Sequence, residues 1–235
     1  MIYFYHRSEI DTMQENIIES TGYNSVYIKS ILYFGIKRFV DIIGSLFGLI
    51  FLLPICLIVK ISYVLHKDFN SIFFTQYRIG KDGNLFKFYK FRTMVPNADD
   101  VLFELLKKDK KLAKEYKINK KLKNDPRITK MGKYLRNSSL DELPQLINVL
   151  KGDMSLVGNR PYLPREQEDM GEYFDDIIKT KPGLTGYWQV SGRSDTSFDY
   201  RLKLEKYYSN NYNLLFDIKI LLNTVRVVLL KKGAK

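Results

Sequence analysis

Two adjacent carboxylates, Asp141 and Glu142, stand out in a basic sequence, within the stretch 138-SSLDELPQL-146. Apolar residues with helical spacing follow the pair: Leu143, Leu146, Ile147 and Leu150. Pro144 is tolerated in a first helical turn, because the N–H that it lacks has no partner there. The pattern predicts a short helix that ends at Gly152, with Asp141 at or near its N-cap and Glu142 just inside.

The pair has two interpretations. An N-cap aspartate contributes about 0.5–2 kcal/mol to helix stability, and acids in the first turn interact favourably with the helix dipole. Capping alone could therefore account for both residues. Capping leaves the neighbouring cations unexplained: Lys90, Arg92, Arg127, Lys130, Lys133, Arg136 and Arg160. Gly-bearing turns also occur at 155-SLVGNRP-161 and 182-PGLTGYWQVSGRSD-195. Such a set indicates phosphate chemistry, in which cations neutralise phosphate oxygens while a carboxylate holds Mg²⁺ or attacks phosphorus.

The composition limits the other classes of chemistry. The 235 residues suit one ordinary domain, and 38 Lys and Arg against 26 Asp and Glu give a net charge of +12. This excess predicts an anionic partner: nucleic acid, anionic lipid or a phosphorylated substrate. A single Cys excludes an internal disulfide, and two His argue against a His-based zinc site or a Ser-His relay.

Two kinds of element are expected to position these residues. The aromatic runs 72-IFFTQYRI-79 and 85-LFKFYKFRT-93, separated by GKDGN, predict a β-hairpin, with Lys90 and Arg92 on the same strand face as Phe88. A helical, lysine-rich segment from Ala98 to Lys123 predicts a solvated helix face. Close to the apolar segment the same face could also contact anionic lipid headgroups. RNA binding is the weakest of the three interpretations, because aromatic residues are not interleaved with the lysines.

One apolar segment is long enough to meet a membrane. The stretch from Ile42 to Val59 is uncharged and spans about 27 Å as a helix, close to the thickness of a bilayer core. Basic residues flank both ends, namely Lys37 and Arg38 before and Lys60 and Lys67 after. Pro54 interrupts the segment, so it forms either a kinked transmembrane helix or a re-entrant hairpin with both ends on one side.

The C-terminal segment 213–232 is apolar but contains charged residues. Lys219, Asn223 and Arg226 recur on one helical face, and charges at these positions argue against a membrane span. The segment is predicted to be an amphipathic helix on a membrane surface or against the core.

Four stretches together resemble the bacterial sugar transferase family, whose members are monotopic polyprenyl-phosphate phosphoglycosyl transferases. They are KRFVDIIGSLFGLIFLLP, KFYKFRTM, DPRITKMGKYLRNSSLDELPQLINVLKGDMSLVGNRP and KPGLTGYWQVSGRSD. The resemblance runs from residue 31 to 230. It implies transfer of a sugar-1-phosphate from a UDP-sugar to undecaprenyl phosphate with release of UMP, as the first membrane step of surface polysaccharide assembly. The stretches DPRITK and VSGRSDTSFDY are closer to the hexose-1-phosphate branch, with galactose or glucose as the sugar.

The resemblance also implies roles for individual residues. Asp141 is the expected nucleophile, which forms a covalent phosphosugar-aspartyl intermediate. Glu142 is expected to hold Mg²⁺ together with Asp141, and Lys90 and Arg136 complete the expected catalytic set. The expected substrate-binding residues are Arg92, Asp125, Arg127, Asn159, Arg160, Pro161, Gln189 and Arg193.

The resemblance further implies an architecture and partners. The expected fold is α+β: a compact, mostly helical catalytic domain with a small β-hairpin, anchored by a re-entrant membrane hairpin and amphipathic interfacial helices. The expected divisions are a polar lead-in (1–30), the hairpin (31–66) and a catalytic domain (67–235) on the cytoplasmic face of the bacterial inner membrane. The expected partners are a UDP-sugar, undecaprenyl phosphate and membrane lipid, with no nucleic acid, and a homodimer stays open.

The sequence departs from the family pattern at three places. Asn159 replaces the first proline of the usual SLVGPRP stretch, and Leu53 precedes Pro54 where a serine is frequent. Larger relatives carry an N-terminal multi-helix membrane region that this sequence lacks. Two other functions stay open: a Mg²⁺-dependent phosphohydrolase of nucleotide sugars, and a non-catalytic basic membrane scaffold in which the two acids only cap a helix.

Overall fold

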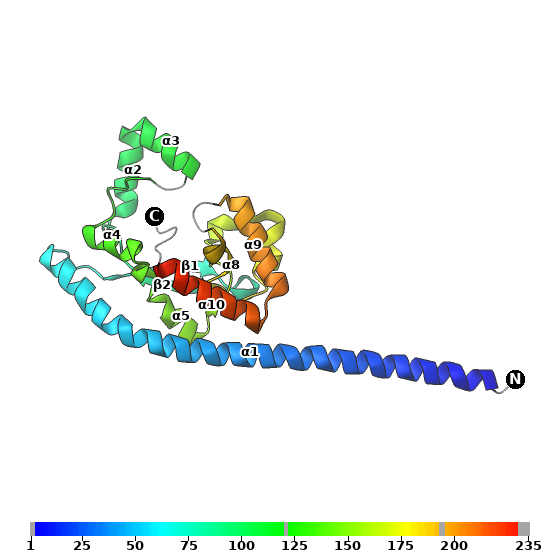
Figure 1. Cartoon of the computed structure of the whole chain (residues 1–235). Coiled ribbons are helices and arrows are strands. Elements are labelled where there is room, and N and C mark those ends of the chain that lie inside the picture. The colour runs from blue at the N-terminus through cyan, green and yellow to red at the C-terminus, as the bar shows by residue number, and fades with distance from the viewer. Residues whose placement is uncertain (1–2, 120–121, 193–195, 230–235) are drawn as a thin grey trace. The chain divides into compact units, whose positions relative to one another are not determined.

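The computed structural model describes residues 3–119, 122–192 and 196–229, which are mostly helical with two small two-stranded sheets (Figure 1). The strands are β1 (Phe73–Ile79), β2 (Leu85–Phe91), β3 (Ser155–Val157) and β4 (Gly183–Thr185). The α-helices are α1 (Tyr3–Leu65), α2 (Ala98–Lys108), α3 (Lys110–Asn119), α4 (Lys130–Asn137), α5 (Gln145–Lys151), α6 (Gln167–Met170), α7 (Phe174–Ile177), α8 (Tyr187–Ser191), α9 (Phe198–Asn211) and α10 (Leu214–Leu229). Short 3₁₀ turns are η1 (Lys81–Gly83), η2 (Leu140–Glu142), η3 (Pro164–Glu166) and η4 (Gly171–Tyr173).

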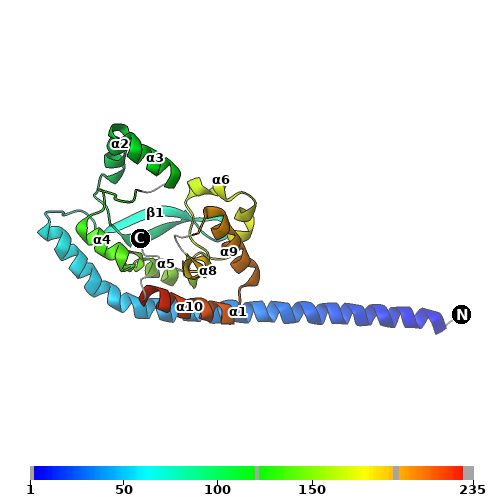
Figure 2. The ribbon, with the colours of Figure 1, turned by 45° about the horizontal axis from the view of Figure 1, so that its top comes forward.

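The predicted β-hairpin is confirmed. Strands β1 and β2 pair antiparallel from Phe73 opposite Phe91 to Ile79 opposite Leu85. Gly83 takes a positive φ of 80° in the connection, which is the conformation that the Asp-Gly signal predicts. In both views the hairpin lies between α4 and α9 (Figures 1 and 2).

The lysine-rich segment is helical, as predicted, and forms two helices. Helix α2 has no buried residue, which agrees with a solvated face. Helix α2 ends just before Asp109. The Asp109 Oδ1 accepts hydrogen bonds from the backbone N–H groups of Lys111 and Leu112 at 2.7 and 3.2 Å. These are two of the N–H groups that the first turn of α3 leaves unpaired, so Asp109 acts as the cap that starts a second helix.

Helix α1 runs without interruption through Pro54, and the structure does not contain the break of a hairpin at that residue. Its part from Ser30 to Leu65 is long and apolar enough to cross a membrane, which suggests membrane association. The helix curves toward its end at Leu65 (Figures 1 and 2). Pro54 removes one helical hydrogen bond from α1. The helix responds with a bend and stays continuous.

The chain divides into two compact units, Met1–Val40 and Asp41–Lys235. Within the second unit α1 contributes to the core, because Val59 and Tyr63 are buried in one cluster with Phe91 of β2 and Leu135 of α4. The other face of this stretch exposes Phe47, Ile50, Phe51, Leu53, Leu57, Ile58 and Ile61. The predicted division at residues 30 and 66 stays a prediction.

The second sheet pairs two short parallel strands, with Ser155 opposite Gly183 and Val157 opposite Thr185. A Cβ on Gly183 would lie 2.1 Å from the Gly158 nitrogen, so the two backbones approach closely because Gly183 has no side chain. Val157 belongs to a buried cluster with Tyr208 of α9 and Ile220 of α10.

The predicted amphipathic C-terminal helix is present as α10. Asp217 and Ile220 are buried on its inner face, where Asp217 accepts a hydrogen bond from the Tyr208 hydroxyl at 2.7 Å. Lys219 and Arg226 are exposed. Four exposed apolar residues recur at helical spacing: Leu215, Ile218, Leu222 and Val225.

Candidate active site

The acidic pair lies in the 3₁₀ turn η2, between α4 and α5. The turn begins at Ser139, a non-glycine residue in the left-handed region with φ 56° and ψ 16°. Helix α5 starts at Gln145 with Pro144 as its N-cap and stops at Gly152, whose φ is 90°. The predicted stop at Gly152 is confirmed. The expected place of Asp141 at or near the N-cap is wrong, because i→i+3 hydrogen bonds form a separate turn before Pro144.

The two carboxylates have different environments. Asp141 is buried with 6% of its surface exposed, and its Oδ2 lies 3.1 Å from the Lys90 Nζ of β2. Glu142 is exposed. A charge-assisted bond of this length holds the Asp141 carboxylate in a fixed position.

Arg136 of α4 is the second cation beside Asp141. Its Nε donates to the Thr93 Oγ1 at 2.9 Å. Burial lowers the pKa of Arg136, and the nearby charge of Asp141 opposes this shift. The structure therefore brings together three of the four expected catalytic side chains, Asp141, Lys90 and Arg136, and Glu142 follows Asp141 in the chain.

The position of Arg136 depends on close packing of α4. Thr129 caps the helix, because its Oγ1 accepts from the Gly132 N–H at 2.9 Å. A Cβ on Gly132 would lie 1.9 Å from the Thr93 carbonyl oxygen, so only glycine allows α4 to approach the residue that holds Arg136.

Three of the expected substrate-binding residues form local ion pairs. Arg92 lies just beyond β2, where its Nη2 is 2.8 Å from Asp68 and its guanidinium stacks on the Tyr63 ring at 4.6 Å. Arg127 pairs with Asp125 at 2.6 Å. Burial alone would raise the pKa of Asp125, but hydrogen bonds from Arg127 outweigh it and lower that pKa. These contacts position the loops around β2 and α4, and a role in substrate binding stays a prediction.

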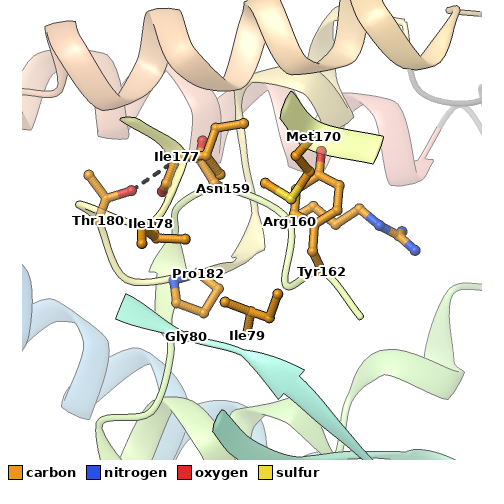
Figure 3. Close-up of a pocket in the computed structure, with 10 residues that line it drawn as sticks. All are labelled: Ile79, Gly80, Asn159, Arg160, Tyr162, Met170, Ile177, Ile178, Thr180 and Pro182. Atoms are coloured by element: carbon orange, nitrogen blue, oxygen red, sulfur yellow. Dashed lines mark hydrogen bonds between the residues drawn. The ribbon is translucent and has the colours of Figure 1, made fainter. Parts of the chain in front are cut away.

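Asn159, which replaces the proline of the family pattern, is a buried residue whose side chain links three segments of the chain. It is buried, and its Nδ2 donates to the Ile177 carbonyl at 3.1 Å and to the Ser209 hydroxyl at 2.6 Å. Figure 3 shows Asn159 turned toward Thr180 at the edge of a small cavity. The side chain thus ties the loop after β3 to α7 and α9.

The remaining expected residues follow Asn159 or lie on α8. The Arg160 guanidinium points away from the cavity of Figure 3, and its Cζ lies 6.0 Å from the Trp188 ring centre. Pro161 is buried and its carbonyl accepts from the Arg78 Nη1 at 3.1 Å. Gln189 is half-buried on α8, and Arg193 lies outside the described residues.

Asp141 and Glu142 are a suitable but incomplete set of magnesium ligands. The described residues contain no group of three or more His, Cys, Asp and Glu side chains that could hold a metal ion. Protein Mg²⁺ sites often use one or two carboxylates, with waters and substrate phosphates as the other ligands. The two acids fit this arrangement, in which a phosphorylated substrate would supply the remaining oxygens.

Comparison with known proteins identifies the family. The model of the family described as "Bacterial sugar transferase" matches residues 32–231. The chain belongs to the bacterial sugar transferase family.

Relatives within this sugar transferase family carry informative names. The chain is 46% identical over 199 residues to "Undecaprenyl-phosphate galactose phosphotransferase" of Salmonella typhimurium, an alignment that covers 85% of the chain and 41% of the relative. It is 46% identical over 202 residues to "Galactosyl transferase CpsE" of Streptococcus agalactiae, covering 85% and 43%. It is 41% identical over 198 residues to "Exopolysaccharide production protein ExoY" of Sinorhizobium fredii, covering 84% and 87%. The chain thus spans about two fifths of the first two relatives and most of the third.

The sequence analysis of this sugar transferase missed a second charged cluster. Arg201 and Glu205 of α9, Arg78 of β1 and Trp188 of α8 lie around Arg160. The spacing of Arg201 and Glu205 was the available signal, but an i, i+4 pair of opposite charges normally indicates a solvated helix face. Here Glu205 is 1% exposed.

Proposed function

We propose that this chain transfers a hexose-1-phosphate, with galactose the best-supported sugar, from a UDP-sugar to undecaprenyl phosphate and releases UMP. The observation that carries the proposal is the buried Asp141 carboxylate with the Lys90 ammonium 3.1 Å away and Arg136 close by, inside a sugar transferase domain. The names of the Salmonella and Streptococcus relatives support galactose. The name of the ExoY relative supports a role in exopolysaccharide production.

The proposed reaction has two displacements at one phosphorus atom. The Asp141 carboxylate attacks the phosphorus that carries the sugar, the phosphoanhydride bond breaks, and UMP leaves with the bridging oxygen. A phosphate oxygen of undecaprenyl phosphate then attacks the same phosphorus and releases the carboxylate. One phosphoanhydride replaces another, so the reaction needs no ATP.

Cations make this attack feasible, because a carboxylate and a diphosphate repel each other. Lys90 holds Asp141 and, with Arg136, faces the charge that develops on the phosphoryl oxygens. Glu142 and Asp141 would hold Mg²⁺, which would supply further charge neutralisation at the phosphate oxygens.

The lipid acceptor requires access to a membrane. The exposed apolar face of α1 and the apolar residues of α10 would contact lipid, with the active site at the cytoplasmic face of the inner membrane. The proposal includes a re-entrant course of the apolar segment in the membrane, which requires a sharper bend than α1 has here and would place both ends on the side where UDP-sugars occur.

Incubation of the purified full chain with Mg²⁺ and a panel of UDP-hexoses tests the nucleophile. We expect intact-mass spectrometry to detect a hexose-phosphate adduct in the absence of lipid, and peptide mapping to place it on Asp141. The substitution Asp141→Asn preserves size and hydrogen bonding but removes the nucleophile, so it should lower UMP release by at least a thousandfold.

Two outcomes would contradict the proposal. Undecaprenyl diphosphate sugar that accumulates with unchanged rate in Asp141→Asn would exclude the covalent mechanism. Free sugar phosphate released without lipid, at the rate of UMP release, would instead identify a phosphohydrolase. Asp153→Asn, at an acid of the loop after α5, serves as the matched control and should keep most of the activity.

A further inference from the structure

The guanidinium of Arg201 is held among aromatic rings. Its Cζ lies 4.5 Å from the ring centre of Phe198, 4.9 Å from that of Tyr162 and 5.0 Å from that of Trp188. Arg160 lies over the same Trp188 ring. Stacking occupies the faces of a guanidinium group and leaves the N–H groups at its edge for an acceptor. We call Arg78, Arg160, Arg201 and Trp188 the arginine cluster.

The arginine cluster carries more positive than negative charge. The buried carboxylate next to the cluster is that of Glu205. Its Oε1 accepts a hydrogen bond from the Arg160 backbone N–H at 3.3 Å, and the charges of Arg160 and Arg201 act on it. Glu166, on the other side, is 3.8 Å from Arg78. Burial and then the charge of Arg160 lower the pKa of Arg78 to about 10, which shows that the cations repel each other.

Polar atoms of the cluster lack partners. Within the part of the chain that the structure describes, the Nε atoms of Arg78, Arg160 and Arg201 are buried without a hydrogen-bond acceptor. A buried donor without an acceptor destabilises the protein, and more so on a charged group. Repelling, underpaired guanidinium groups are what an anion-binding site contains before its ligand arrives.

The cluster lies within electrostatic reach of the acidic pair. The charge of Glu142 acts on Arg78, whose Nη1 holds the Pro161 carbonyl next to Arg160. Lys90 and Arg136 already lie beside Asp141, where the transferred phosphoryl group would react. A nucleoside diphosphate has a second phosphate, which needs cations of its own.

We propose that Arg160 and Arg201 bind the phosphate of the nucleoside diphosphate that stays with the nucleoside, and that Arg78 holds the loop which presents Arg160. This inference rests on the proposed function and adds Arg201 and Arg78 to the donor site. The rings of Tyr162 and Trp188 fix the plane of the Arg201 guanidinium, so little side-chain entropy is lost on binding.

Trp188 provides a direct readout, because it is the only tryptophan in the sequence. The full chain in lipid nanodiscs would be titrated with UDP, with uridine and with inorganic pyrophosphate while tryptophan emission is recorded. We expect a saturable change with UDP, none with uridine at equal concentration, and a weaker one with pyrophosphate. Undecaprenyl phosphate that changes the emission while UDP does not would overturn the proposal in favour of an acceptor site.

Arg201→Gln tests the assignment, with Lys203→Gln as the matched control that removes one exposed cation from the same helix. We expect Arg201→Gln to raise the UDP dissociation constant and the KM for the UDP-sugar at least tenfold, with a smaller change in kcat, and Lys203→Gln to stay within twofold. Arg201→Lys keeps the charge without the planar fork, and should bind UDP at least threefold more weakly if Arg201→Gln fails to fold.

The outcomes separate this inference from the proposed function. Wild-type affinity for UDP in both Arg201 variants would overturn the inference and leave the reaction intact. Asp141→Asn should keep the UDP-dependent emission change while it loses UMP release. A chain that binds UDP through Arg201 but releases no UMP from any UDP-hexose would contradict the proposed reaction alone.

Discussion

At the scale of single residues, the buried carboxylates Asp141 and Glu205 have different surroundings. Asp141 lies 3.1 Å from the Lys90 ammonium, which is partly exposed. Glu205 is fully enclosed, and burial raises its pKa to about 7. The charges of Arg160 and Arg201 oppose this shift but do not outweigh burial, so the ionised form of Glu205 is costly.

This cost predicts a pH dependence of stability. Glu205 has an ordinary pKa of 4.5 when unfolded and about 7 when folded. Between these values the folded protein binds a proton that the unfolded chain has released, so the Glu205 contribution to stability falls as pH rises from about 4.5 to 7. Glu205→Gln mimics the protonated form and should stabilise the protein above pH 7, by up to roughly 3 kcal/mol.

Thermal unfolding of the wild type and Glu205→Gln at pH 5 and pH 8 checks this expectation. The difference in unfolding midpoint should be several degrees larger at pH 8 than at pH 5. Glu104→Gln, at an exposed residue of α2, is the control and should show no such dependence. An equal difference at both pH values would mean that Glu205 does not change its ionisation on folding.

The residues around the acidic pair were easier to single out from the sequence than those around Arg160. Asp141 and Glu142 were found because they are adjacent, precede a proline and lie in a basic stretch. Strand alternation predicted Arg92 on the same strand face as Lys90, but the strand ends at Phe91, and Arg92 contacts Asp68 and Tyr63. Such partners depend on how α1 packs against β2, which local patterns do not contain.

At the scale of secondary-structure elements, the position of α4 controls the site. Arg136 reaches Thr93 only because Gly132 lets the helix lie against the Thr93 carbonyl. The hairpin and this helix were predicted from turn residues and periodicity. The continuous helix from Tyr3 to Leu65 was not, because its first half lacks an apolar period.

Gly132→Ala should therefore reduce both stability and activity. The added methyl group meets the Thr93 oxygen at 1.9 Å, and the shift of α4 should cost about 1–3 kcal/mol. The same shift breaks the Arg136–Thr93 hydrogen bond, so we expect kcat to fall at least tenfold, measured as UMP release. Gly35→Ala places the same methyl group on α1 with no atom within 4 Å, so it should leave activity unchanged and should not lower stability, since Ala favours a helix over Gly. Unchanged kcat in Gly132→Ala would show that Arg136 does not need this position.

At the scale of the whole molecule, the course of α1 decides how the enzyme meets the membrane. Ser30 and Asn70 flank the apolar segment and are exposed. In a Cys56→Ala background, Ser30→Cys and Asn70→Cys place a single label at either end. We expect a membrane-impermeant maleimide to modify both in inverted vesicles and neither in intact spheroplasts, because a re-entrant segment keeps both ends on the cytoplasmic side. Labelling of the two positions from opposite sides would establish a transmembrane helix instead.

Two glycines of α1, Gly44 and Gly48, let the helix pack closely against β3 and α5. A Cβ on Gly44 would lie 2.7 Å from Leu156, and one on Gly48 would lie 2.6 Å from Leu146, while Asp41 accepts hydrogen bonds from the Ser155 hydroxyl and the Leu156 N–H. Leu146 belongs to α5, which directly follows the acidic turn. Leucine side chains that pack on these two glycines prevent α1 from sliding or rotating. One residue inserted into the helix would turn the glycines away from the leucines by about 100°. If α1 enters a membrane as proposed, its depth in the lipid would therefore fix the height of the acidic turn above the bilayer.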